Sequence, residues 1–174
     1  MPAVRDCDAA DRQAFQWLAG RITTLPPQKP VIVHNDLKLE NVMLDPVEPA
    51  RVGTLLDWDM CTRGDPLADI GLLLAYWGER GDDPALHGTT PPLTAMVGFP
   101  SRDWWVTEYA RRTGRDLAEI GFYRIYGLVK WAVLGEQLLR LSLAGNDSDP
   151  RVREYEKQVP ALFQEARRLC QQSS

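Results

Sequence analysis

The chain has 174 residues, 44% of them apolar, and its 20 basic side chains against 24 acidic ones give a net charge of −4. A chain of this length can bury enough surface to fold as one domain without disulfides. The mild acidity argues against binding to nucleic acid or to an anionic membrane. Since no apolar run is long enough to cross a bilayer and the first residues lack a secretory signal, we expect a soluble cytoplasmic protein with no membrane partner.

The cysteines indicate a reducing compartment. There are three of them, Cys7, Cys61 and Cys170, and none forms a C-x-x-C pair. An odd number at this spacing predicts neither a disulfide framework nor a zinc site. We therefore expect free thiols that pack as small apolar groups.

The first third of the chain mixes helix and strand signals. Asp8 and Asp11 can cap a first helix, which should end before Pro26 because proline cannot continue it. Short runs rich in β-branched residues then predict three strands, at 31–33, 42–44 and 52–56.

The remainder reads as helical. Asp65 before Pro66 is a typical helix start, and the apolar run 70–77 predicts a buried helix. The stretch 78–100 is rich in Gly and Pro and predicts a long loop. Further helices are expected from Ser101, over 117–144, and from Asp149 to Cys170.

The candidate chemistry lies in residues 31–69. A polar loop carrying His34, Asp36, Lys38 and Asn41 follows the first predicted strand. If 42–44 pairs antiparallel with 54–56, this hairpin places Asn41 beside Asp57.

These residue types together fit phosphoryl transfer. An amide oxygen on Asn41 and a carboxylate on Asp57 are ligands of the kind that Mg²⁺ prefers, with water and substrate phosphates completing its shell. Asp36 is placed to accept a proton from an attacking hydroxyl. Lys38 can direct a positive charge at the transferred group.

Each polar residue also has an ordinary structural interpretation. His34 fits a hydrogen-bonded scaffold residue, Asp65 fits a helix cap, and Asp69 fits a side chain bonded to the loop beneath which it lies. The joint pattern His-x-Asp-x-x-x-x-Asn, followed by an Asp after a strand, is much more specific than any of its members.

This pattern resembles a known family. The segment from His34-Asn35-Asp36 to Asn41 is similar to the catalytic loop that protein kinases share with the aminoglycoside phosphotransferase and choline kinase group. Leu55-Leu-Asp-Trp-Asp59 and Gly64-Asp-Pro-Leu-Ala-Asp69 resemble the latter group, and most closely the phosphotransferase-like domain fused to some acyl-CoA dehydrogenases. Asp-Phe-Gly and Ala-Pro-Glu motifs, typical of protein kinases, are absent.

The resemblance implies transfer of the γ-phosphate of ATP, with Mg²⁺, to a hydroxyl of a small molecule. It makes Asp36 the catalytic base, Asn41 and Asp57 the ligands of the metal on the nucleotide, and Asp65 and Asp69 braces of the loop. Lys38 departs from the family, in which His or Arg is more usual, and resembles protein kinases instead.

The resemblance also implies a fold class. We expect an α+β, mostly α structure: the C-terminal lobe of a kinase-like fold, whose short hairpins carry the catalytic loop beside a helical bundle. Within 1–174 this gives a catalytic core over 31–77, the loop 78–100 and a helical subdomain over 101–172. No Gly-rich strand or Val-Ala-x-Lys-like segment occurs, so the N-terminal lobe is expected to be missing.

Alternatives of other classes stay open. An isolated lobe is expected to be weakly active or inactive, and it can be a non-catalytic remnant or interaction module completed by another chain, by a separate N-terminal lobe or by a second copy of itself. Metal-dependent hydrolysis by Asp57 and Asp59 is disfavoured, since alternate residues of a strand face opposite sides. The sequence does not indicate which hydroxyl compound is the substrate.

Overall fold

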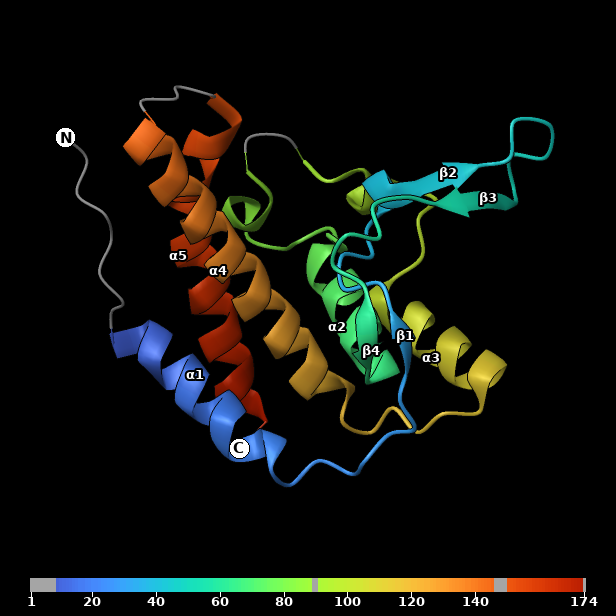
Figure 1. Cartoon of the computed structure of the whole chain (residues 1–174), viewed down its shortest axis with the longest axis horizontal. Helices are drawn as coiled ribbons and strands as arrows, with labels where there is room; N and C mark the ends of the chain where they lie inside the picture. The colour runs from blue at the N-terminus through green and yellow to red at the C-terminus, as the bar shows by residue number, and fades with distance from the viewer. Residues whose placement is uncertain (1–8, 89–90, 146–149, 174) are drawn as a thin grey trace.

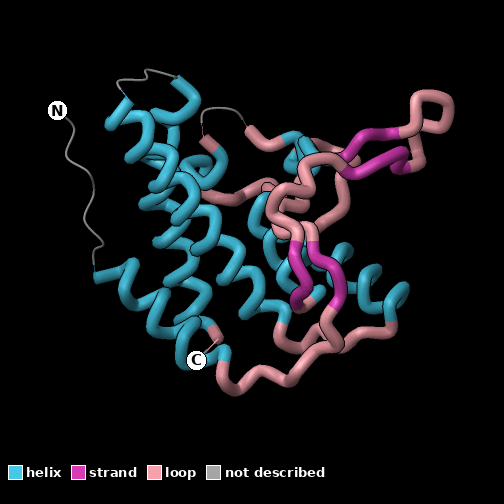
Figure 2. Tube along the Cα trace, viewed as in Figure 1, coloured by secondary structure: helices cyan, strands magenta, loops and turns pink. Residues whose placement is uncertain are grey.

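The structure is a computed structural model that describes residues 9–88, 91–145 and 150–173. It is mostly helical, with a few short strands (Figures 1 and 2), as the sequence predicts for the α+β, mostly α class. The α-helices of the described residues are α1 (Ala9–Ile22), α2 (Pro66–Tyr76), α3 (Arg102–Thr113), α4 (Ile120–Gly145) and α5 (Pro150–Gln172).

The strands form two separate antiparallel pairs. They are β1 (Val31–Val33) with β4 (Thr62–Gly64), and β2 (Val42–Leu44) with β3 (Val52–Leu55). The first two predicted strands are confirmed, and the third ends one residue earlier than predicted. β4 was not predicted, because its three residues, Thr, Arg and Gly, carry no apolar alternation.

Most predicted helix boundaries hold. Asp65 caps α2 by accepting the N–H of Leu67 at 2.9 Å, and Ser101 caps α3 by accepting the N–H of Trp104 at 3.1 Å. The long helix begins at Ile120 rather than at 117. The stretch predicted as a loop contains two short 3₁₀ helices, η2 (Pro84–His87) and η3 (Leu93–Ala95).

Three residues named in the sequence analysis are not described by the structure. The expected caps Asp8 and Asp149, and Cys7, lie outside the described residues. Of the other two cysteines, Cys61 is exposed and Cys170 is buried.

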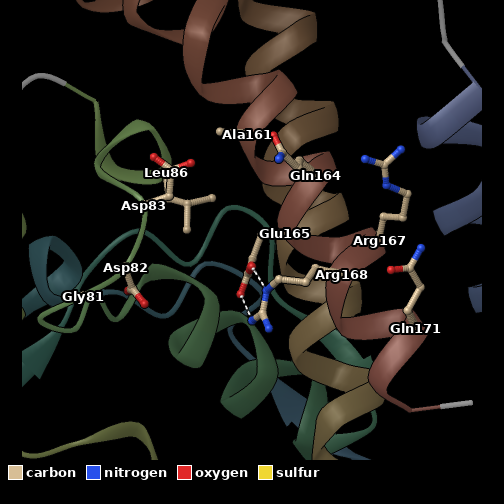
Figure 3. A pocket seen from close by; sticks show the side chains of 10 residues that line it. All are labelled: Gly81, Asp82, Asp83, Leu86, Ala161, Gln164, Glu165, Arg167, Arg168 and Gln171. Carbon is tan, nitrogen blue, oxygen red and sulfur yellow. Dashed lines mark hydrogen bonds and ion pairs between the residues drawn. The ribbon is translucent and has the colours of Figure 1, made fainter.

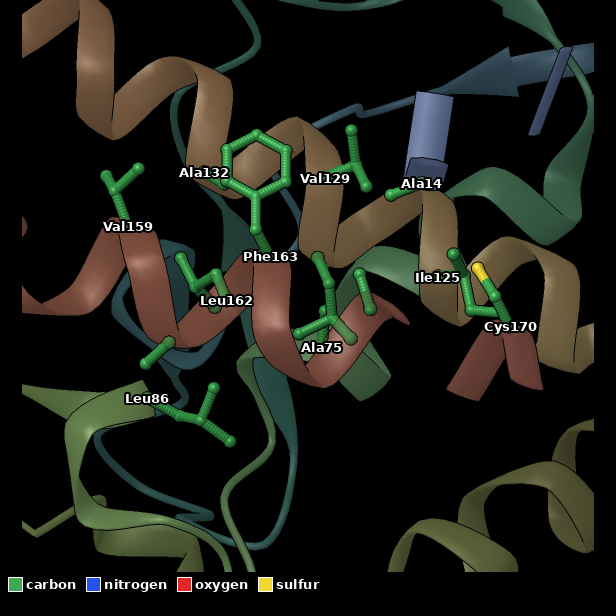
Figure 4. Close-up of a cluster of buried hydrophobic side chains, with 13 residues drawn as sticks. Ala14, Ala75, Leu86, Ile125, Val129, Ala132, Val159, Leu162, Phe163 and Cys170 are labelled. Carbon is green, nitrogen blue, oxygen red and sulfur yellow. The ribbon is translucent and has the colours of Figure 1, made fainter. Parts of the chain in front are cut away.

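The core lies where the long helices meet. α4 packs between α2 and α5, and α1 lies against α5 and α4 (Figure 1). Ile125 of α4 and Leu162 and Phe163 of α5 are buried in this cluster, with Leu86 of η2 covering one end (Figure 4). The burial of these side chains stabilises the helical body to which the site residues are anchored.

Two glycines bring α2 and α4 into close contact. A Cβ atom on Gly71 would collide with the backbone of Tyr123, and one on Gly127 would lie 2.8 Å from the carbonyl oxygen of Gly71. Only glycine allows this approach of two helix backbones. The contact fixes α2, which carries Asp65, Asp69 and Tyr76, against α4.

None of the helices in the described parts of the chain has the length and apolar character needed to span a membrane.

Candidate active site

A tight turn after β1 begins the site. Asn35 adopts a left-handed backbone conformation, with φ of 63°. Both oxygens of the Asp69 carboxylate accept backbone N–H groups of this turn, from His34 and from Asn35, each at 2.7 Å. On the other side, Lys130 of α4 donates from Nζ to the Asn35 carbonyl oxygen at 2.5 Å. The turn that precedes Asp36 is thus held by α2 and α4 together.

His34 is a buried structural element of this turn. Its Nδ1 accepts the backbone N–H of Asp36 at 3.2 Å, and its Nε2 lies 2.7 Å from the carbonyl oxygen of Leu56. These partners fit the tautomer with its proton on Nε2, which leaves neither nitrogen free to move a proton. The ring also packs against Trp58, with centroids 4.7 Å apart.

Asp36 is buried, and both of its carboxylate oxygens are engaged. Oδ2 lies 2.7 Å from Nζ of Lys38 and accepts a hydrogen bond from Nδ2 of Asn41 at 3.1 Å. Oδ1 accepts the hydroxyl of Tyr76 at 3.2 Å. The structure therefore brings Asp36, Lys38 and Asn41 together.

The register of the β2–β3 hairpin differs from the predicted one by a residue. Val42 lies opposite Leu55, and the N–H of Leu56 donates to the carbonyl oxygen of Asn41 at 2.8 Å. Asn41 therefore pairs with Leu56, and Asp57 follows one position further on. An irregularity between Met43 and Leu44 near the hairpin turn also breaks the simple pairing rule.

Asp57 lies beyond the end of β3 with an exposed side chain and a left-handed backbone, φ 62°. A non-glycine residue in this conformation carries strain that often marks a functional position. Asp57 and Asp59 are not on a strand, so the alternation invoked to place them on opposite faces does not apply.

Asn41 and Asp57 offer the oxygen donors that Mg²⁺ takes. Both described hydrogen bonds of the Asn41 amide use Nδ2, at 2.8 Å to the Asp36 carbonyl oxygen and 3.1 Å to its carboxylate, which leaves the amide oxygen as the available ligand atom. The exposed Asp57 carboxylate has no bonded partner among the described residues. No group of three or more His, Cys, Asp or Glu side chains in those residues is arranged to hold a metal. This donor set fits a cation that relies on water and phosphate oxygens for most of its shell.

Asp65 does more than cap α2. Its other oxygen accepts the hydroxyl of Tyr123 on α4 at 2.6 Å. Burial raises the pKa of Tyr123, and the hydrogen bond to Asp65 raises it further. The phenol therefore stays protonated and keeps donating, so Asp65 ties the start of α2 to α4.

Sequence reasoning missed two residues that contact this loop, Tyr76 and Lys130. Both stand in apolar helices, where a Tyr or Lys gives no motif, and they lie 40 and 95 residues from their partners. The signal available was a lysine inside an apolar stretch. Burial lowers the pKa of Lys130, while the nearby charges of Asp36 and Asp69 oppose that change.

Comparison with known families identifies the family of this chain. The profile of the phosphotransferase enzyme family matches residues 2–123, more than half of the chain. The chain belongs to this family.

The similar curated proteins are much longer than this chain. Acyl-CoA dehydrogenase family member 11 of Gallus gallus is 26% identical over 170 residues, which cover 95% of this chain and 21% of that protein. Its counterpart in Mus musculus is 32% identical over 139 residues, covering 78% and 17%. Member 10 of Mus musculus is 25% identical over 154 residues, covering 88% and 14%. This chain thus spans about a fifth or less of the length of these relatives.

A solved structure shares the fold. A crystal structure of a candidate aminoglycoside phosphotransferase from Ralstonia eutropha superposes with a TM-score of 0.72 at 24% identity. The match covers 94% of this chain and 49% of that one. The chain therefore has the fold of about half of that kinase-like protein.

One cavity lined by described residues lies away from Asp36. It measures about 460 Å³ and lies between the segment around Asp82 and the last turns of α5 (Figure 3). Glu165 on its wall is bonded to Arg168 at 2.6 Å, and Asp82 is bonded to Arg102. None of the predicted site residues lines it.

Proposed function

We propose that this chain carries the base and metal-binding half of an ATP- and Mg²⁺-dependent phosphotransferase that phosphorylates a hydroxyl of a small molecule. The observation that supports the proposal most strongly is the cluster around Asp36, whose carboxylate is bonded to Lys38 and Asn41 within one short loop. Family membership supports the same reaction class.

In this proposal Asp36 accepts the proton of the acceptor. The acceptor O–H bond breaks as its oxygen bonds to the γ-phosphorus, and the bond from that phosphorus to the β-γ bridging oxygen breaks, leaving ADP. The proton goes to the Asp36 carboxylate. Lys38, which pairs with Asp36 at 2.7 Å, turns toward the transferred group, where negative charge is spread over three oxygens.

Asn41 and Asp57 hold Mg²⁺ in this proposal, through an amide oxygen and a carboxylate oxygen. When bound, the ion neutralises charge on the phosphates of the nucleotide. Asn41 has a second task, because its Nδ2 group orients Asp36 at the same time. Asp69, Asp65 and His34 keep the loop in shape.

The proposal is tested by transfer of ³²P from γ-labelled ATP to a panel of sugars, amino alcohols and hydroxyacyl thioesters. We expect weak Mg²⁺-dependent labelling by the chain alone, since it has the fold of about half of the solved phosphotransferase. Asp36→Ala should lower the rate by about 10²- to 10⁴-fold. The exposed Asp59→Ala is the matched control and should keep the wild-type rate. Equal rates in Asp36→Ala and wild type, or no labelled product from wild type, would contradict the proposal.

A second candidate is a module completed by another chain. Several apolar side chains of the β2–β3 hairpin are exposed: Met43, Leu44 and Val52. Such a surface favours association with a second copy or a separate lobe. Sedimentation velocity at increasing concentration tests self-association, and a monomer at all concentrations would contradict it.

A further inference from the structure

Tyr76 belongs to a helix of the core but contacts the candidate active site. It is the last residue of α2, and its hydroxyl donates to Oδ1 of Asp36 at 3.2 Å. Its ring lies edge-on to Trp131 of α4, with centroids 4.7 Å apart, and Nζ of Lys38 lies 5.6 Å from the ring centroid. The ring is therefore held from two sides while its hydroxyl faces the carboxylate.

The phenol can act only as a donor here. Burial raises the pKa of Tyr76, and the charge of Asp36 and the hydrogen bond to it raise the pKa further. The hydroxyl keeps its proton over the working pH range, so Tyr76 is always the donor in its hydrogen bond to Asp36.

The two oxygens of Asp36 are held by different parts of the molecule. The partners of Oδ2, Lys38 and Asn41, belong to the same loop as Asp36, five residues or fewer away. Tyr76, the partner of Oδ1, comes from α2, 40 residues along the chain. The last side-chain torsion of an aspartate is broad, so a carboxylate held only by its own loop can turn. A donor on a second, rigid element removes that freedom.

We propose that Tyr76 is a positioning residue for the phosphoryl-transfer base: it holds Oδ1 of Asp36 so that Oδ2 faces the acceptor hydroxyl. The inference rests on the proposed function. When Lys38 turns to the transferred phosphoryl group, Oδ2 loses one of its partners and becomes the oxygen that takes the acceptor proton. Tyr76 keeps Oδ1 occupied throughout, and Trp131 keeps Tyr76 in place.

A purely structural role for Tyr76 makes different predictions. In that case removal of the hydroxyl, with the ring retained, would leave the geometry and the catalytic parameters of Asp36 unchanged. Tyr126 on α4 offers the comparison, because it is also partly buried and its hydroxyl has no hydrogen-bond partner in the described parts of the chain.

The experiment compares the whole chain as wild type, Tyr76→Phe and Tyr126→Phe. Kinetics with ATP and a labelled acceptor should show a kcat about 5- to 30-fold lower in Tyr76→Phe, with KM for ATP within about twofold. Tyr126→Phe should match wild type in both parameters.

A second readout needs no activity. In NMR spectra the side-chain amide protons of Asn41, which donate to Asp36, should exchange with water several-fold faster in Tyr76→Phe than in wild type or Tyr126→Phe. Unchanged exchange would overturn the role of Tyr76 whether or not the chain phosphorylates anything. Faster exchange without any phosphotransfer by wild type would instead contradict the proposed function, and with it the catalytic role of the Tyr76–Asp36 contact. An unchanged kcat in an active Tyr76→Phe variant would also overturn the inference.

Discussion

The ammonium group of Lys130 donates a 2.5 Å hydrogen bond to the carbonyl oxygen of Asn35, across 95 residues of sequence. Asn35 has a left-handed backbone and directly precedes Asp36. The bond therefore links the long helix α4 to the turn that precedes Asp36, the proposed base. Asp69 holds the same turn from α2, so two helices fix one strained peptide.

Lys130→Met should loosen this turn while keeping the apolar stem of the side chain. We expect a loss of about 1–2 kcal/mol in the free energy of unfolding, since a charged donor is removed from a carbonyl group. Hydrogen exchange of the segment 31–36, measured by mass spectrometry, should become faster. The exposed Lys157→Met on α5 is the control. Equal exchange of 31–36 in both variants would contradict the proposed role of Lys130 in holding this turn.

The left-handed backbone of Asp57 should make glycine more stable than alanine at this position. Its φ of 62° disfavours residues with a Cβ, so Asp57→Gly is expected to unfold with a free energy equal to wild type or up to about 1 kcal/mol higher. Asp57→Ala keeps the Cβ and loses the polar group, and should be less stable than Asp57→Gly. Urea unfolding of the three proteins measures this order, and a Gly variant less stable than the Ala variant would contradict it.

The close approach of α2 and α4 should tolerate no side chain at Gly71. A methyl group there would meet the backbone of Tyr123, so Gly71→Ala should lower the free energy of unfolding by about 1–3 kcal/mol or more. Gly121 lies on α4 with nothing within 4 Å of its Cβ position. Gly121→Ala should be neutral or slightly stabilising in thermal unfolding, because alanine favours helix. Similar losses in both variants would argue against the close packing.

Much of this arrangement follows from local sequence signals, and some does not. The caps Asp65 and Ser101 were predictable because a cap needs only its own short segment. The strands 31–33 and 42–44 were predictable from their β-branched residues. The eight-residue motif over 34–41 also sufficed to predict that Asp36 and Asn41 lie close together.

The features that escaped prediction depend on the exact packing of distant segments. The register of β2–β3 shifts at an irregularity between Met43 and Leu44, which no pattern of side chains predicts. β4 forms by pairing with β1, with Gly64 opposite Val31, and its own composition gives no strand signal. Tyr76 contacts Asp36 from α2, which packs against α4 through the close approach at Gly71 and Gly127.

The ion-pair cluster at Asp82 should make the free energy of unfolding depend on pH in the acid range. Burial on its own would raise the pKa of Asp82, but bonds from His87, Arg102 and the Glu79 N–H outweigh it and lower the pKa well below its usual range. The unfolded chain therefore binds more protons than the folded one just below pH 4, and the stabilisation from Asp82 is full above that pH and lost as pH falls further.

Asp82→Asn should remove this contribution. At pH 7 we expect a free energy of unfolding about 1–3 kcal/mol below wild type, since buried Arg102 loses a partner. The difference should shrink as pH falls from 4 to 2. Urea unfolding at pH 7, 5, 4, 3 and 2 measures it, with the exposed Asp59→Asn as control. A difference that stays constant with pH would contradict the assignment.

Titration of the chain with ATP in a calorimeter, with and without Mg²⁺, tests the central claim that Asn41 and Asp57 hold a metal-bound nucleotide beneath Asp36. We predict binding that requires Mg²⁺, is weakened at least about tenfold in Asp57→Asn, and is retained in the neighbouring control Asp59→Asn. ATP binding that is independent of Mg²⁺, or equally strong in Asp57→Asn and Asp59→Asn, would contradict it.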